Sequence, residues 1–172
     1  MITCAFYSFK GGVGRTMALA NIAELCYRAG LKVLMIDWDL EAPGLERFFS
    51  IEKEDVIDNP GLMDMLQEYK KRMAQSPSKN DDQKLPFAKI DPFVVDVYPN
   101  DTGTGRLLLL PAGRRSGEYF AEYSNTILTF DWHDFYENWE GEIFFEWLRK
   151  QFKDEFDTDI VLIDSRTGVT EI

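Results

Sequence analysis

The sequence predicts an α/β fold in which a mostly parallel sheet is flanked by helices. Three short and nearly continuous apolar runs, at residues 3–9 (TCAFYSF), 32–37 (KVLMID) and 159–164 (DIVLID), are typical of strands buried on both faces of such a sheet. Between the first two runs, apolar residues recur at helical spacing from Thr16 onward, and Gly30 is well placed to end that helix. A strand, a helix and a strand in this order form the crossover unit of parallel sheets.

The middle of the chain is less regular. In order, we predict a helix with an apolar stripe over 60–73, a polar loop at 76–84, strands at 93–98 and 106–110, and two helices within 116–156 that separate near Phe130. Residues 87–156 form an aromatic and acidic region that resembles an insert. We expect one domain over residues 1–172, since about 100–200 residues is a common domain size.

Composition excludes several classes of protein. The 172 residues include 19 Lys and Arg against 30 Asp and Glu, which gives a net charge of −11. This balance argues against a general nucleic-acid binder, although one local phosphate site remains compatible with it. Two cysteines and one histidine exclude a disulfide framework and a multi-histidine metal centre. No run approaches the roughly 20 apolar residues that span a bilayer, so we find no case for a membrane protein and expect a cytoplasmic one.

The segment Lys10-Gly11-Gly12-Val13-Gly14-Arg15-Thr16 carries the chemistry. It lies between a predicted strand and a predicted helix, where glycines let successive backbone amides turn toward one anion. The positive end of the helix dipole favours the same anion. A tight turn without a ligand would explain the glycines alone, but it would not explain the two flanking cations and the threonine. We therefore predict a phosphate site.

Acidic residues follow two of the predicted strands. Asp37 ends the second strand, Asp39 lies two residues further on, and Asp164 ends the last strand. Ligands of open α/β sheets bind at the carboxyl ends of strands, and carboxylate oxygens suit magnesium. The alternative is that Asp37 and Asp39 only cap a turn.

These motifs resemble the deviant Walker A ATPases of the ParA/MinD type, whose loop reads K-G-G-x-G-K-[S/T]. The resemblance is close over residues 1–49 and returns at 157–172. It includes KGGVGRT, DWDLEAPGL and IDSRTG, which are shared with a less-studied branch of that family. It implies a P-loop fold, ATP as substrate and Mg²⁺ as cofactor.

The resemblance also implies roles for individual residues. Lys10 matches the signature lysine that reaches across a dimer to the partner's nucleotide, although it could instead bind its own nucleotide or face solvent. Thr16 matches the magnesium-binding hydroxyl, and Asp39 matches the aspartate that positions the attacking water near the metal. Asp164 would support magnesium through a water, and the Gly168 amide would meet the γ-phosphate.

Arg15 departs from the family pattern, which has lysine at that position. Arginine is longer, planar and bidentate, so binding could survive while turnover becomes slow or is lost. Arg166 replaces a common proline, and contact with phosphate and pairing with a nearby acid both stay open. Arg114 and Arg115 follow a predicted strand end, where an approach to the nucleotide is one alternative, and we expect them in a solvated turn.

The expected function is Mg-ATP binding with slow hydrolysis, used as a nucleotide-dependent dimerisation switch. The alternative is a catalytically inactive nucleotide-sensing or protein-interaction module of a larger protein. We expect a homodimer, and a protein partner for the 87–156 region, because aromatic residues are enriched at interfaces. We also expect the chain to be the N-terminal part of a longer protein, since further elements follow this point in the resembling ATPases.

Overall fold

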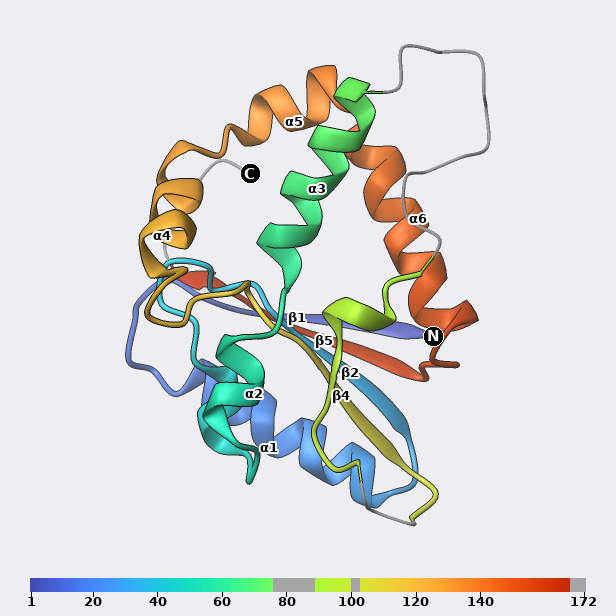
Figure 1. Cartoon of the computed structure of the whole chain (residues 1–172). Helices are drawn as coiled ribbons and strands as arrows, with labels where there is room; N and C mark the ends of the chain where they lie inside the picture. Colours follow the sequence, from blue (N-terminus) through green and yellow to red (C-terminus); the bar gives the residue numbers. More distant parts are fainter. Residues whose placement is uncertain (76–88, 100–102, 168–172) are drawn as a thin grey trace.

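The described part of the chain forms a five-stranded sheet with the strand order β1–β5–β2–β4–β3 (Figure 1). The computed structural model describes residues 1–75, 89–99 and 103–167. β1, β5, β2 and β4 are parallel neighbours, whereas β3 runs antiparallel to β4. The predicted mostly parallel α/β fold is therefore confirmed. The strands are β1 (Ile2–Ser8), β2 (Lys32–Asp37), β3 (Val95–Asp96), β4 (Arg106–Leu110) and β5 (Ile160–Thr167).

Helices cover both faces of this sheet (Figure 1). One face carries α1 (Arg15–Arg28), the 3-10 turn η1 (Leu45–Phe48) and α2 (Lys53–Ile57). The other carries α3 (Leu62–Gln75), α4 (Phe120–Thr129), α5 (Trp132–Asn138) and α6 (Gly141–Asp154), and a second 3-10 turn, η2 (Asp91–Phe93), precedes β3. Side chains alternate across a strand, so Val33 and Met35 of β2 pack on the α1 side while Leu34 and Ile36 pack on the α3 side.

The prediction was wrong about the surroundings of β1. This strand was expected to be buried on both faces, but it lies at the end of the sheet and pairs with β5 alone among the described strands. Ile2 is 64% exposed and Tyr7 is 51% exposed. An apolar sequence is enclosed only where neighbouring elements cover it, and β1 has a strand beside it on one side only among the residues that the structure describes.

Other differences concern element boundaries. The segment after Phe130 holds two helices instead of one, because the chain breaks at Glu140, whose φ of +55° is left-handed. The last strand was expected to end at Asp164, but β5 continues to Thr167, and α2 and η1 were not predicted. The predicted loop at 76–84 lies outside the described residues.

Most aromatic side chains of the 87–156 region fill the core. Phe135, Phe144 and Phe152 are buried, and Trp132, Trp139, Phe145 and Trp147 pack partly buried against the same cluster. Phe120 is an exception, since it is 61% exposed. Packing thus accounts for much of this aromatic content, and a partner surface in this region stays a prediction.

Among the described residues, no helix is long and apolar enough to cross a membrane.

Candidate functional site

The loop that joins β1 to α1 opens into a cavity of about 510 Å³. Gly12 and Gly14 have φ values of +72° and +81°, a left-handed backbone that glycine adopts without strain. Left-handed residues alternating along a turn direct successive amides toward one point, as in anion-binding nests. The cavity is lined by Ser8, Gly11, Gly12, Val13, Gly14, Arg15, Thr16, Met17, Asp39, Glu41, Ala42 and Phe48.

Strand register brings the predicted acids to the same edge of the sheet. Asp37 of β2 lies opposite Asp164 of β5, and the Trp38 amide donates to the Asp164 carbonyl at 2.9 Å. Asp39 follows immediately beyond this pair. Its side chain is 17% exposed and reaches the cavity, whereas that of Asp164 is 1% exposed and lies behind it.

Arg15 joins the two acids. Its Nε donates to Asp164 Oδ1 at 2.5 Å and its Nη2 donates to Asp39 Oδ2 at 2.7 Å. The Arg15 side chain is 7% exposed. Burial by itself lowers the pKa of Arg15, but the hydrogen bonds and charges of Asp164 and Asp39 outweigh it and raise the pKa above its ordinary value. One permanent positive charge therefore lies between two carboxylates at the floor of the cavity.

The Asp37 side chain accepts hydrogen bonds from the segment that follows β2. It is buried, and its Oδ2 accepts hydrogen bonds from the amides of Gly44 at 3.0 Å and Leu45 at 3.2 Å. These contacts agree with the turn-capping interpretation for this residue. Burial raises the pKa of Asp37 to about 6, and the two amide bonds oppose that shift only partly.

The raised pKa of Asp37 predicts a pH-dependent stability. The carboxyl titrates near 6 when folded and near 3.8 when unfolded, so between these values the folded state binds the extra proton. Stability from this group consequently rises as the pH falls through 6, by about 1 kcal/mol between pH 7 and pH 5. Urea unfolding at the two pH values should show this gain, and Asp37→Asn should lack it. An equal gain in the variant would assign the effect to other groups.

The remaining predicted residues are more dispersed. Thr16 lines the cavity, whereas Lys10 is exposed and is absent from the cavity lining. Gly168 lies outside the described residues. The side chain of Arg166 also lies outside the described part of the chain, and both interpretations of that residue stay predictions.

Sequence reasoning missed the contacts that fix the loop after Asp39. Arg115 was expected in a solvated turn, but its side chain is 9% exposed and forms an ion pair at 2.9 Å with Glu46, which is 2% exposed. Nearby, the Tyr123 hydroxyl donates to the Leu40 carbonyl at 2.7 Å. These partners lie about 70–80 residues apart in the sequence, and no local pattern links them.

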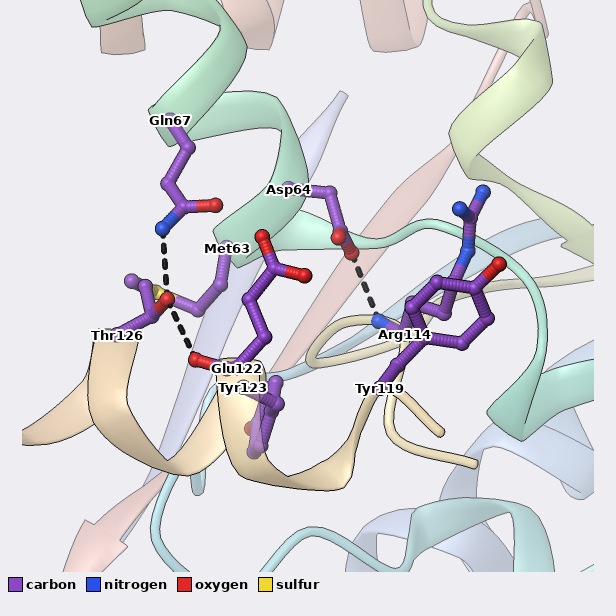
Figure 2. Close-up of a pocket in the computed structure, with 8 residues that line it drawn as sticks. All are labelled: Met63, Asp64, Gln67, Arg114, Tyr119, Glu122, Tyr123 and Thr126. Carbon is purple, nitrogen blue, oxygen red and sulfur yellow. Dashed lines mark hydrogen bonds between the residues drawn. The ribbon is translucent and has the colours of Figure 1, made fainter. Parts of the chain in front are cut away.

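Two other cavities are lined by residues of α4. A groove of about 560 Å³ between the segment 40–47 and α4 shares Glu41 and Ala42 with the loop cavity. The second, of about 100 Å³, lies between α3, α4 and the turn after β4 (Figure 2). There the Arg114 amide donates to Asp64, and Gln67 donates to the Thr126 hydroxyl. This pocket is smaller than small-molecule sites, which usually measure about 300–1,000 Å³. Its hydrogen bonds connect α3 to α4 and to the turn after β4.

Comparison with known proteins agrees with this arrangement. Residues 4–159 match the family model of the CobQ/CobB/MinD/ParA nucleotide binding domain. The chain belongs to this family. No curated protein matches the sequence.

Two solved structures share the fold of this family member. A plasmid partition protein from Borrelia burgdorferi is 20% identical, with a TM-score of 0.53, and the match covers 96% of this chain and 56% of that protein. pNOB8 ParA, solved bound to nonspecific DNA, is 18% identical, with a TM-score of 0.53, over 98% of this chain and 48% of that protein. The chain thus spans about half the length of these proteins.

Proposed function

We propose that this chain binds ATP in the cavity beside the Gly11–Thr16 loop and hydrolyses it slowly, as a nucleotide-dependent dimerisation switch. The observation that carries the proposal is the glycine loop between β1 and α1, which opens into a cavity of about 510 Å³. The family's nucleotide-binding character supports it. Loop amides and the helix N-terminus would hold the phosphates, and Arg15 would supply the positive charge.

Hydrolysis requires a water to attack the γ-phosphorus as the bond to the β-phosphate oxygen breaks. In the proposal, Asp39 orients that water and the Gly168 amide meets the γ-phosphate. Lys10 is exposed and absent from the cavity lining, which is compatible with a reach toward the nucleotide of a partner subunit.

The residues also suit a magnesium ion chemically. Asp39, Asp164 and Thr16 offer oxygen ligands at one end of the sheet, and magnesium prefers oxygen. When bound, the ion would neutralise charge on the phosphates. Arg15 already binds one oxygen of each carboxylate, however, so those two oxygens become available to the ion only when its guanidinium leaves them.

That arrangement favours one alternative function, a nucleotide-sensing module without turnover. Arg15 binds the two acids on which the proposed hydrolysis depends. Phosphate release, measured on protein that binds ATP, separates the two functions. DNA binding by a relative is not carried over, because the net charge of −11 in this chain opposes it.

A pair of glycine substitutions tests the nucleotide site. Saturation with Mg-ATP at about 100 times its Kd should stabilise the chain by roughly 2.7 kcal/mol, a rise in Tm of about 5–10 °C. Gly11→Glu should abolish that rise by placing a carboxylate in the anion site. Gly117→Glu is the matched control, since a Cβ at either glycine meets nothing within 4 Å. No rise in the parent, or the same rise in Gly11→Glu, would contradict the site.

Light scattering of the same samples tests the dimer. A non-hydrolysable triphosphate with magnesium should convert the parent to a dimer, whereas Lys10→Ala should bind nucleotide and stay monomeric. A parent that remains monomeric at saturation, or a variant that dimerises equally well, would refute the corresponding part of the proposal.

A further inference from the structure

Arg15 occupies the place between Asp39 and Asp164 where one cation can satisfy both carboxylates. Its Nε and Nη2 bind one oxygen from each acid, at 2.5 Å and 2.7 Å. A planar guanidinium can bind two carboxylates at once, whereas a lysine ammonium is a compact point charge on a flexible stem. The arginine that distinguishes this loop is thus matched to the pair of acids beneath it.

The same contacts occupy one oxygen of each acid and place a positive charge where a second cation would bridge them. Asp164 is 1% exposed and does not line the loop cavity, whereas Arg15 does, so the guanidinium lies between Asp164 and the open space. A divalent ion that used both carboxylates would have to displace a buried, permanently charged group. Removal of one partner from such a cluster carries a large energetic cost, because a charge is left uncompensated.

We propose that Arg15 determines the cation specificity of this site by excluding divalent ions from Asp39 and Asp164 until a phosphate group draws its guanidinium away. Phosphate is a suitable competitor, because arginine binds it through two parallel hydrogen bonds as it binds carboxylates. Arg15 also borders the cavity, so it can turn from the acids to an anion there. The identity of the releasing group rests on the proposed function, whereas the exclusion of cations does not.

Manganese alone, without nucleotide, tests the exclusion. Free Mn²⁺ is measured by electron paramagnetic resonance as each form of the 172-residue chain is added. We expect Arg15→Met to bind Mn²⁺ at least about tenfold more tightly than the parent, because the two carboxylates lose their counter-charge. Arg28→Met is the matched control, since it removes an exposed arginine from the far end of α1 and should bind as the parent does.

A double substitution locates the new site. Arg15→Met combined with Asp164→Asn should lose the gained affinity, whereas a gain that persists would place the ion elsewhere and overturn the proposal. Equal Mn²⁺ affinity of the parent and Arg15→Met would also overturn it. Circular dichroism checks folding, and if Arg15→Met is unfolded, Arg15→Lys provides the same test with an intermediate gain expected.

The result is independent of the ATP experiment. A parent that excludes Mn²⁺ but shows no thermal shift with ATP would retain the exclusion and refute the nucleotide site. A parent that binds ATP and also binds Mn²⁺ as tightly as Arg15→Met would retain the nucleotide site and refute the exclusion.

Discussion

Replacement of Arg115 by methionine is expected to lower the free energy of unfolding by about 3–5 kcal/mol, because it leaves the buried Glu46 carboxylate without its counter-charge. The side chains of Arg115 and Glu46 are 9% and 2% exposed, and the charged atoms lie 2.9 Å apart. Arg115 also donates through Nη1 to the Gly113 carbonyl, and its backbone amide donates to Ile57. The pair therefore links the turn after β4 to the loop after β2. Urea unfolding measures the loss.

The neighbouring arginine provides the control. Arg114 is half-buried, lies over the Tyr119 ring at 4.9 Å and donates from its side chain to the Asp58 carbonyl. Arg114→Met should therefore cost only about 1 kcal/mol or less. Arg115→Met combined with Glu46→Gln should recover part of the loss, because no charge then remains buried alone. Equal effects of the two single substitutions would show that burial of the ion pair is not the cause.

Phe135→Ala is expected to be as damaging, at about 3–5 kcal/mol, because it removes a ring from the centre of the α3-side core. Phe135 is 0% exposed, and its ring lies 6.0 Å from that of Tyr69 and 5.8 Å from that of Phe144. The helices around it belong to different segments of the chain, so the cavity left by the ring would loosen contacts among α3, α5 and α6. The lowered midpoint of thermal or urea unfolding measures this effect.

Phe120 is the matched aromatic control. It lies on α4 and is 61% exposed, so Phe120→Ala should change stability by about 1 kcal/mol or less. If Phe120→Ala proved as costly as Phe135→Ala, the aromatic residues of this region would not divide into core and surface as the structure indicates.

Local sequence pattern predicted the elements of this fold well where burial was strong. The run 32–37 became β2 with those same limits, because every position from Val33 to Asp37 is buried. The pattern could not show that β1 is an edge strand, since apolar character does not reveal which strands lie beside it. It also missed the break at Glu140, where a non-glycine residue adopts a left-handed conformation.

In the candidate site, too, local sequence pattern predicted some features and missed those that depend on distant segments. Gly12, Gly14, Asp39 and Asp164 lie where strand ends and turn chemistry place them, so the sequence was sufficient to gather them at one edge of the sheet. The pairing of Arg15 with both acids was not predictable, because it depends on side-chain reach across three segments. Their functional roles stay predictions until the experiments above are done.

Within the described part of the chain β1 is an edge strand, and its composition bears on how this protein is handled. Residues 2–8 (ITCAFYS) contain no charged residue and no proline, the two features that most often keep an edge strand from pairing with another chain. An edge strand of this composition can pair with the edge strand of another chain, so edge-to-edge aggregation is expected as the protein concentration rises. Light scattering that increases with protein concentration to the same extent with and without nucleotide would indicate such aggregation. Work at low protein concentration would then avoid it.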